Sequence, residues 1–439
     1  MFIYGKKMIE LFNILFFSIF LSLLFFMPFI NKTKISSRKL TLDSYDLRTL
    51  NILLLFNLIL IFVILNLKIS QITNIFFSLI FIFMIYFLIN FKKLTFQKDI
   101  YFYFFFYSLI LFVLSIDLSN NLTLYWDGQK LWLPKAIIFY NNGYVSDLSS
   151  TAYSHYSFLG SLLWAFFWKI SSFEYEYFGR VFFLAIYCFA LFNFLSMVSI
   201  NKNLKIISFL LLILLTYDYW HFRGTQEILI FSFLLILIKY LYNLLIKNQN
   251  NKLNLFYILL CLNLIIWTKN EGIILSLIIS LIILIFLKES VKFKLILLSI
   301  PLLMILIRFI SFKLNGLDVD LSQDFDFSNI LMIFINNFSI ANIFLISKYI
   351  VFSAFKFPHI ILSLLFAILI CFKKSLFKKY IFLYVYLFLS FLLIFLIYLS
   401  STNIEFMVST GSLRLMFEFS APYLLFILVF FKERFKITE

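Results

Sequence analysis

Residues 380–399 read YIFLYVYLFLSFLLIFLIYL and contain no charged side chain. A run of about 18 or more apolar residues is typical of a helix that crosses a membrane. Comparable runs recur along the 439-residue chain, which is 63% hydrophobic and 13% charged, whereas soluble domains average about 25% charged residues. The strands of a membrane barrel would alternate apolar and polar residues, and these runs do not. The sequence therefore predicts an all-α integral membrane protein.

The expected architecture is a polytopic bundle of about 13 transmembrane helices. The expected spans are residues 8–30, 50–67, 72–91, 100–117, 178–200, 204–217, 227–246, 253–267, 273–287, 295–312, 357–372, 380–399 and 413–431. Two further apolar runs, residues 158–170 and 341–355, are expected to be re-entrant or interfacial helices. The chain then divides into N-terminal transmembrane helices (1–117), a large outer loop with interfacial helices (118–177) and the remaining bundle (178–439), as a single membrane domain.

The formal net charge of +16 is interpreted as a topology signal and not as a nucleic-acid surface. Lys and Arg cluster in short loops between the apolar runs, including residues 31–49 and 91–99. Such loops face the cytoplasm under the positive-inside rule. This orientation places the three histidines (His155, His221 and His359) and most of the acids at the outer face. Because ionisable groups in membrane proteins are usually functional, we expect the working face there.

The outer loop begins with SNNLTLYWDGQKLWLPKAIIFYNNG (residues 119–143). Residues 126–140 suit a helix at the membrane surface, with Lys130 and Lys135 near lipid phosphates. Asp127 stands at the start of this helix. It has two open interpretations, a structural N-cap or a carboxylate that acts as a general base.

Three other short segments concentrate charge at the expected outer face. They read YDYWHFRGTQE (residues 217–227), WTKNEG (267–272) and STGSLRLMFE (409–418). Their candidate residues are Asp218, His221, Arg223, Glu227, Lys269, Glu271, Arg414 and Glu418. Solvated turns or structural ion pairs are the simple explanation. Arg414 and Glu418 are four apart on one helix face, so Glu418 could also hold Arg414 for bidentate contact with a phosphate.

Metal and soluble-enzyme motifs are missing from the sequence. Asp318, Asp320, Asp324 and Asp326 lack the glycine and terminal glutamate of a calcium loop and are expected to be solvated. No P-loop, GxSxG, HExxH or CxxC motif occurs. We therefore predict no protein-held metal site.

These segments together resemble the lipid-dependent glycosyltransferases of the GT-C class. The likeness is carried by WDGQKLWLPKAIIFYNNG, YSHYSFLGSLLWAFFWKI, EYEYFGR, WTKNEG and TGSLRLMFEFSAPYLL. It is nearest to the bacterial family related to protein mannosyltransferases and lipid A aminoarabinose transferases. The resemblance implies transfer of a sugar from a polyprenyl-phosphate carrier to a glycan, lipid or protein acceptor. It also implies 11 to 14 transmembrane helices in a multi-pass protein of the cytoplasmic (inner) membrane, active on its periplasmic side and surrounded by membrane lipids.

The resemblance implies roles for single residues. Asp127 matches the catalytic acid of the first loop, and Lys269 matches a lysine placed toward the donor phosphate. Glu227 matches an acid at a helix start that faces the same cavity, and His155 lies where relatives have a Pro-containing turn. Lys135, His221, Arg223, Glu271 and Arg414 complete the expected substrate-binding set.

The chain departs from the family pattern at two places. Relatives carry paired acids in the first loop, whereas Gly128 and Gln129 follow Asp127 here, so the involvement of a divalent cation is left open and no other cofactor is expected. Residues 154–157 replace the Pro-containing turn. The competing functions are a polytopic transporter and a lipid-glycan flippase or polymerase. Repeated halves would favour a transporter, and none is visible.

Overall fold

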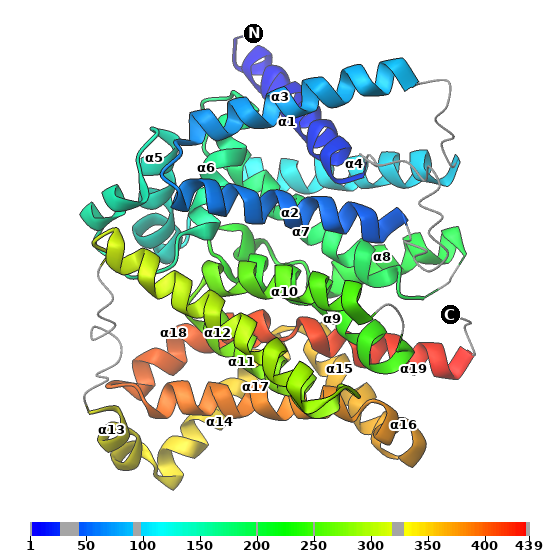
Figure 1. Cartoon of the computed structure of the whole chain (residues 1–439), viewed down its shortest axis with the longest axis vertical. Helices are drawn as coiled ribbons and strands as arrows, with labels where there is room; N and C mark the ends of the chain where they lie inside the picture. Colours follow the sequence, from blue (N-terminus) through cyan, green and yellow to red (C-terminus); the bar gives the residue numbers. More distant parts are fainter. Residues whose placement is uncertain are drawn as a thin grey trace. The chain divides into compact units, whose positions relative to one another are not determined.

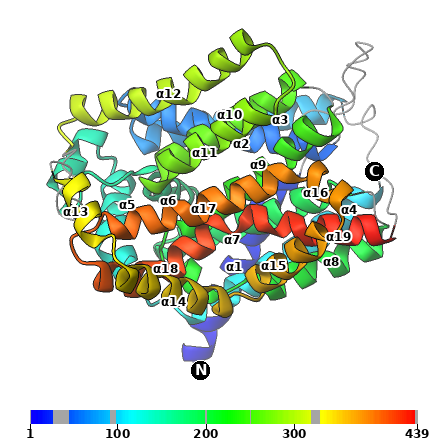
Figure 2. The ribbon, with the colours of Figure 1, turned by 90° about the horizontal axis from the view of Figure 1, so that it is seen from below.

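The computed structural model describes residues 2–26, 44–90, 98–198, 201–248, 251–317 and 329–435. Within these ranges every regular element is a helix (Figures 1 and 2). The prediction of an all-α fold is confirmed. The basic loops at residues 31–43 and 91–97 and the acidic run from Asp318 to Asp326 lie outside the described residues.

Eight of the described helices are long and apolar enough to cross a membrane, and the number is ten if two bent helix pairs each count as one span. The eight coincide with expected runs and cover Met8–Phe25, Tyr45–Ile64, Phe102–Asn120, Tyr177–Leu195, Glu227–Lys247, Asn251–Thr268, Val291–Leu314 and Ile381–Leu399. A multi-pass membrane protein with a helical bundle follows from these lengths.

The other expected spans are shorter or broken. Glu271–Phe286 and Pro358–Cys371 are apolar helices below the spanning length, as is the described apolar stretch Ile69–Ile82. Lys202–Thr216 has only 15 residues. The run expected at 413–431 belongs to the pair Ile404–Phe419 and Ala421–Arg434, bent by 45°. Residues 341–355 lie in the second bent pair, Ile330–Asn337 and Ile340–Lys356, which turns by 89°.

The described chain forms two compact units. The first comprises residues 1–193 and 218–226. It contains the α-helices α1 (Phe2–Phe26), α2 (Ser44–Ile64), α3 (Ile69–Asn90), α4 (Lys98–Asn120), α5 (Leu133–Tyr140), α6 (Leu159–Ser171) and α7 (Tyr177–Leu195), the last of which ends two residues into the second unit. Three short helices, η2 (Gly128–Trp132), η3 (Val145–Ser150) and η4 (Tyr219–Phe222), lie between them.

The expected outer loop of the first unit is largely helical. The helix predicted at residues 126–140 is present as η2 followed by α5, and Pro134 in the first turn of α5 suits that position because it needs no N–H partner there. The short helix expected at 158–170 is present as α6 and has 13 residues. Their positions at the membrane surface stay a prediction.

Phenylalanine side chains pack the interior of the first unit. All of Tyr177–Leu195 is buried. Phe182 stacks on Phe167 with ring centroids 4.0 Å apart and meets Phe56 edge-on at 5.2 Å. The chain contains 64 phenylalanines, and several of their exposed side chains suit lipid-facing positions. Here phenylalanine also supplies interlocking aromatic contacts between helices.

The second unit comprises residues 194–217 and 227–439. Its helices are α8 (Lys202–Thr216), α9 (Glu227–Tyr242), η5 (Asn243–Lys247), α10 (Asn251–Thr268), α11 (Glu271–Phe286), α12 (Val291–Leu314), α13 (Ile330–Asn337), α14 (Ile340–Lys356), α15 (Pro358–Cys371), α16 (Lys374–Lys379), α17 (Ile381–Leu399), α18 (Ile404–Phe419), η6 (Ala421–Tyr423) and α19 (Leu424–Phe435).

Helix α9 is the buried centre of the second unit. Every side chain from Glu227 to Tyr242 is buried. Helices α10 and α18 pack directly against α9, and α11 packs against α10 and α17. The beginning of α9, the turn from α10 to α11 and the last turns of α18 are thereby brought together, which creates the site described below.

The turn between α10 and α11 depends on Gly272. A Cβ atom at this position would lie 2.0 Å from the carbonyl oxygen of Ile265. That contact is with backbone, so a larger residue would have to move one helix relative to the other. Glycine therefore lets α11 start directly against the last turn of α10.

We predict that Gly272→Ala destabilises the protein by about 1–3 kcal/mol because the methyl group overpacks this turn. Thermal unfolding of the purified protein in detergent measures the change. Gly411→Ala is the matched control, since its Cβ would meet a side-chain oxygen, that of Tyr398, at 3.2 Å. An unfolding temperature for Gly272→Ala equal to that of the wild type would contradict the packing argument.

Candidate functional site

Asp127 directly precedes helix η2 in the first unit and is half-buried. Its own backbone is already helical, with φ −61° and ψ −41°, and its side chain makes no capping hydrogen bond. An N-cap residue normally has extended backbone angles and accepts a hydrogen bond from the helix start. Asp127 therefore does not have the geometry of an N-cap at η2, and its role as a general base stays a prediction.

The backbone around Asp127 is held against the turn at residues 223–224. The N–H of Tyr125 donates to the carbonyl oxygen of Arg223 at 2.9 Å. A Cβ at Gly128 would lie 2.5 Å from that same oxygen, so only glycine allows the approach. Gly224 has a φ of +84°, the left-handed region that glycine tolerates best. Two glycines thus fix the segment that carries Asp127.

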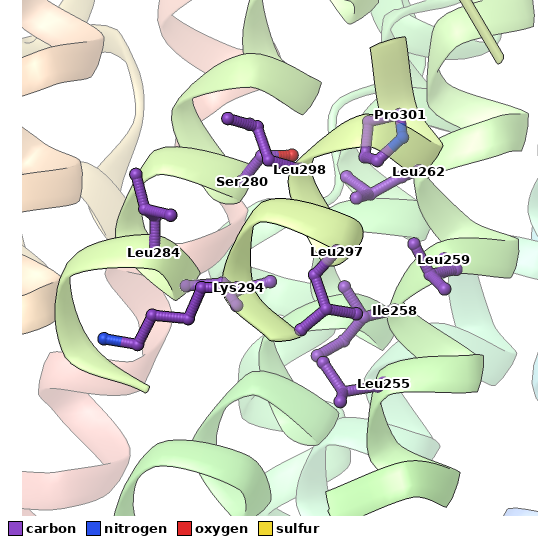
Figure 3. Close-up of a pocket in the computed structure, with 11 residues that line it drawn as sticks. Leu255, Ile258, Leu259, Leu262, Ser280, Leu284, Lys294, Leu297, Leu298 and Pro301 are labelled. Atoms are coloured by element: carbon purple, nitrogen blue, oxygen red, sulfur yellow. The ribbon is translucent and has the colours of Figure 1, made fainter. Parts of the chain in front are cut away.

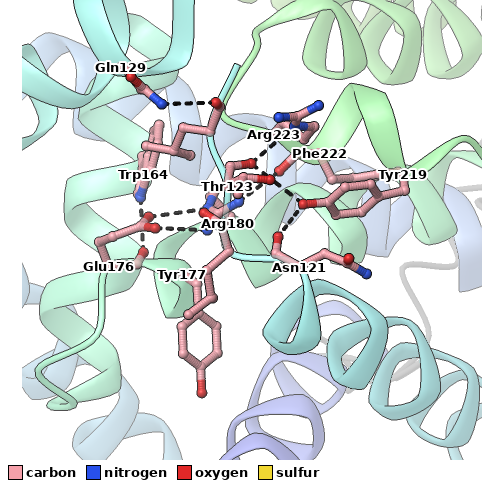
Figure 4. Close-up of polar contacts among 12 residues, drawn as sticks. Asn121, Thr123, Gln129, Trp164, Glu176, Tyr177, Arg180, Tyr219, Phe222 and Arg223 are labelled. Carbon is pink, nitrogen blue, oxygen red and sulfur yellow. Dashed lines mark hydrogen bonds and ion pairs between the residues drawn. The ribbon is translucent and has the colours of Figure 1, made fainter. Parts of the chain in front are cut away.

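Arg180 on α7 joins residues 121–125 to residues 219–224 through hydrogen bonds (Figure 4). Its guanidinium is fully buried and donates to the carbonyl oxygens of Phe222 at 3.2 Å and Leu122 at 3.3 Å. Glu176 balances its charge, with oxygen–nitrogen distances of 2.7 and 3.1 Å. Burial raises the pKa of the Glu176 carboxyl, and Arg180 opposes that rise. Arg180 therefore satisfies backbone groups that would otherwise lack partners.

Arg223 was expected to bind substrate, and part of its guanidinium has a structural contact. Its Nε donates to the carbonyl oxygen of Thr123 at 3.0 Å, and the hydroxyl of Tyr219 donates to that of Asn121 (Figure 4). These bonds join residues 121–125 to residues 219–224. The side chain of Arg223 is half-buried.

Lys135 and His155 come together in the first unit. Lys135 is fully buried and donates from Nζ to the carbonyl oxygen of Tyr156, and it lies 5.9 Å from the centroid of the Trp132 ring. The His155 ring is 4.6 Å from that of Tyr156. Lys135 thus fixes the segment that contains His155, whereas a cation at the lipid surface would be exposed. His221 is buried within η4.

The second unit assembles a compact ionic cluster around Lys269. The ammonium nitrogen lies 2.9 Å from Glu418, 3.1 Å from Glu227 and 3.4 Å from Glu271. Glu227 opens α9, Glu271 opens α11, and Glu418 occupies the last turn of α18. We name these four residues together with Arg414 the Lys269 cluster.

The Lys269 ammonium stays charged. Burial alone would lower the pKa of Lys269, but the carboxylates of Glu227, Glu271 and Glu418 hold it well above its usual value. An ammonium has three N–H donors and no acceptor. The carboxylates of Glu227, Glu271 and Glu418 surround the Lys269 ammonium, so its N–H groups point at oxygens of the protein.

Arg414 lies at the more open side of the cluster. Its Nε is 3.7 Å from Glu227, and 22% of its side chain is exposed. Glu271 is 24% exposed, whereas Glu227 and Glu418 are 2% and 0% exposed. The cluster is therefore accessible past Arg414 and Glu271 and closed behind the other two acids. Glu418, expected to hold Arg414, forms its ion pair with Lys269.

Several buried oxygens of the cluster have no hydrogen-bond partner among the described residues. They are Oε2 of Glu227, Oε2 of Glu271, Oε1 of Glu418 and the hydroxyl of Tyr398, which lies within electrostatic range of Lys269. Buried polar atoms are nearly always paired, so a set of unpaired acceptors indicates a place for donor groups from a ligand or water. Hydroxyl groups are such donors.

Arg308 on α12 is a residue of this site that the sequence analysis did not select. Its guanidinium is buried and donates to the carbonyl oxygens of Ile266 and Lys269, the latter at 3.2 Å, and to the Oδ1 atom of Asn270. These acceptors end α10 and form the turn that carries Lys269. An arginine within an otherwise apolar span was the available signal, because such a charge needs a partner.

A groove elsewhere in the second unit offers little chemistry. It has about 310 Å³ of empty space, part of it open to the surroundings, between α10, α11 and α12. Leucine, isoleucine and proline line it, with Ser280 and Lys294 as its polar side chains (Figure 3). One cation beside an apolar wall cannot supply both an acid and a base. The Lys269 cluster and the Asp127 segment remain the candidate sites.

We predict that Lys269→Met destabilises the protein by about 3–5 kcal/mol, because it leaves buried carboxylates without their ammonium partner. Adding Glu418→Gln removes one of those charges and should recover part of the loss. Unfolding temperatures of both variants in detergent measure the effect. Lys348→Met changes an exposed lysine on α14 and serves as the control. A double variant no more stable than the single one would contradict this electrostatic account.

We predict that Arg308→Lys costs about 1.5–3 kcal/mol of stability, since a lysine keeps the charge but cannot reach all three acceptors with a planar fork. The measurement is again thermal unfolding, with Lys313→Gln as an exposed control on the same helix. Wild-type stability in Arg308→Lys would mean that the charge alone matters and the fork does not.

The described residues contain no group of three or more His, Cys, Asp or Glu side chains arranged to hold a metal ion. The function therefore has to be inferred from the Asp127 segment and the Lys269 cluster. No family model matches the chain, and neither a curated protein nor a solved structure matches it significantly.

Proposed function

We propose that this protein is a membrane glycosyltransferase. It would move a sugar from a polyprenyl-phosphate carrier to a glycan, lipid or protein acceptor at the outer face of the cytoplasmic membrane. The observation that carries the proposal is the Lys269 cluster, a buried set of acids with unpaired oxygens that opens beside an arginine. The sequence resemblance to GT-C enzymes supports the same class of reaction.

The cluster has the complementary groups that a glycosyl phosphate requires. The hydroxyls of a sugar can donate to the unpaired carboxylate oxygens of Glu227, Glu271 and Glu418. A guanidinium can hold a phosphate through two parallel hydrogen bonds. Because membrane proteins seldom bury ionisable groups without a function, such a cluster favours a binding role over a purely structural one.

The proposal assigns the donor phosphate to Arg414 and a different role to Lys269. A phosphate beside Lys269 would face the carboxylates that already surround its ammonium. Arg414 is 22% exposed and lies at the open side of the cluster, where an anion can reach it. Lys269 would then fix the acids that orient the sugar. This differs from the role that the family resemblance implies for Lys269.

The reaction would be a direct displacement at the anomeric carbon. The bond from this carbon to the phosphate oxygen breaks, and polyprenyl phosphate leaves with the electron pair. A bond forms to the acceptor oxygen, whose proton passes to a carboxylate. Cations near the leaving phosphate lower the barrier because they stabilise the developing negative charge. One displacement predicts inversion of the anomeric configuration.

Asp127 is the proposed base. It lies on a segment fixed by Gly128, Gly224 and the buried Arg180. A general base needs a defined position more than a perturbed environment, because proton transfer requires hydrogen-bond distance to the reacting group. The turn described above holds Asp127 in one defined position within the first unit.

A transporter or flippase for a lipid-linked glycan is the second candidate. Buried Lys and Glu side chains in a helical bundle are also typical of substrate and ion pathways. This alternative predicts movement of an intact lipid-linked sugar between leaflets without formation of a new glycosidic bond. Both outcomes can be measured on the same proteoliposomes.

We predict that purified protein in proteoliposomes transfers radiolabelled sugar from a polyprenyl-phosphate donor, and that Asp127→Asn lowers the rate by about 10²-fold or more. Arg414→Lys should raise the apparent KM for the donor, since a lysine cannot form the bidentate contact. Glu174→Gln alters an exposed acid of the first unit and is the control.

Three results would contradict parts of this proposal. Full activity of Asp127→Asn removes that residue from the mechanism. An unchanged donor KM in Arg414→Lys removes the phosphate contact. Transbilayer movement of the lipid-linked sugar without transfer, by folded wild-type protein, would favour the transporter.

A further inference from the structure

A second groove of the second unit combines apolar walls with cations. It lies where α15, α16 and α19 meet and is an open groove with about 270 Å³ of empty space, part of it open to the surroundings. Its apolar lining is Leu369, Ile370, Leu376 and Phe430, and its charged lining is Lys373, Glu433 and Arg434. Figures 1 and 2 show α16 at the end of this unit where α19 runs to the C-terminus. None of these residues belongs to the Lys269 cluster.

The single carboxylate of the groove is already neutralised. Glu433 accepts hydrogen bonds from the ammonium of Lys379 and from the hydroxyl of Tyr380, both at 3.1 Å. Lys373 and Arg434 have no carboxylate partner among the residues that the structure describes. Within the described part of the chain the groove therefore presents two cations that no carboxylate neutralises, a charge distribution that favours an anion.

The surroundings of the groove are basic and apolar at once. The cations nearby in the sequence are Lys373, Lys374, Lys378, Lys379, Lys432 and Arg434. Phe372 is 81% exposed and Phe431 is 42% exposed. Exposed aromatic groups beside lysines are typical of the boundary between lipid and water, where apolar bodies enter the bilayer and charges stay near the headgroups.

We propose that this groove binds an anionic phospholipid of the surrounding bilayer. Lys373 and Arg434 contact the headgroup phosphate, and an acyl chain lies along Leu369 and Phe430. A free anion would use the cations but leave the apolar wall empty. An acidic soluble peptide would leave Phe372 and Phe431 in water, so the lipid fits the whole surface best. This site is independent of the proposed transferase activity.

The test uses the full chain purified in a zwitterionic or neutral detergent, with phosphatidylglycerol or phosphatidylcholine added. Phosphatidylglycerol should raise the unfolding temperature of the wild type by several degrees, and phosphatidylcholine should not. Lys373→Gln combined with Arg434→Gln should lose most of that shift. Lys348→Gln combined with Lys356→Gln removes two exposed lysines from α14 and should keep it. Native mass spectrometry of the same samples should show fewer retained phosphatidylglycerol molecules for the groove variant only.

Three outcomes would overturn the proposal. The first is an equal phosphatidylglycerol shift in the groove variant and the wild type. The second is equal stabilisation by phosphatidylcholine, which would mean that the charge is not recognised. The third is an equal shift with glycerol phosphate alone, which would identify a site for small anions. Unfolding temperatures without lipid show whether each variant is folded before lipid is added.

Discussion

The ammonium of Lys269 is the interaction on which the centre of the second unit depends. Carboxylates from the starts of α9 and α11 and from the end of α18 converge on it within 2.9–3.4 Å. Glu227 and Glu418 are buried, and Glu271 is partly exposed. Bringing these three acids together would be prohibitive without a cation, because the buried charges lose their hydration. The charge of one lysine therefore allows three helix ends to meet, and the same meeting leaves carboxylate oxygens facing inward without partners. The same ion pairs therefore hold the helix ends together and form the candidate binding site.

Both units use a buried arginine to complete helix ends and turns. Arg180 donates to the carbonyl oxygens of Leu122 and Phe222, and Arg308 donates to those of Ile266 and Lys269. A carbonyl group without a hydrogen-bond partner is costly where water is scarce. The guanidinium of arginine has five N–H donors in a fixed planar arrangement, so it can pair with several carbonyl groups at once. Each arginine stands beside a candidate functional segment. At helix ends and turns the carbonyl groups lack an N–H partner from the helix, and the arginine side chains supply the missing donors.

The sequence predicted the helical bundle well because spanning length is a local property. A run such as 381–399 needs no knowledge of its neighbours to be assigned to a membrane helix. Shorter runs were harder. The run at 413–431 contains Ser420 and Pro422, and the missing N–H of proline coincides with the 45° bend between α18 and the following segment. Pro422 thus indicated a break in the helix, but the apolar character of the run favoured a single span.

The site was predictable only in part, for a different reason. Lys269 and Glu271 are neighbours in one turn, so their ion pair follows from the sequence. Glu418 is 149 positions from Lys269, and nothing local links them. The burial of Lys135 was missed because its flanking residues fit a surface helix equally well. The local sequence shows which residues have reactive or charged side chains. Tertiary packing determines which of their atoms already have hydrogen-bond or ion-pair partners.

That distinction changes the assignment of roles within the cluster. The family resemblance implies that Lys269 faces the donor phosphate, and the sequence offers Arg414 as a second residue for bidentate contact with a phosphate. In the folded chain, the contacts of Lys269 and Arg308 are with protein oxygens, while Arg414 remains comparatively open. Two cations can build the site and one can serve the ligand. Positive charge that fixes the acids is as necessary as the charge that meets the substrate, because unpaired buried carboxylates would repel a phosphate from the entire cluster.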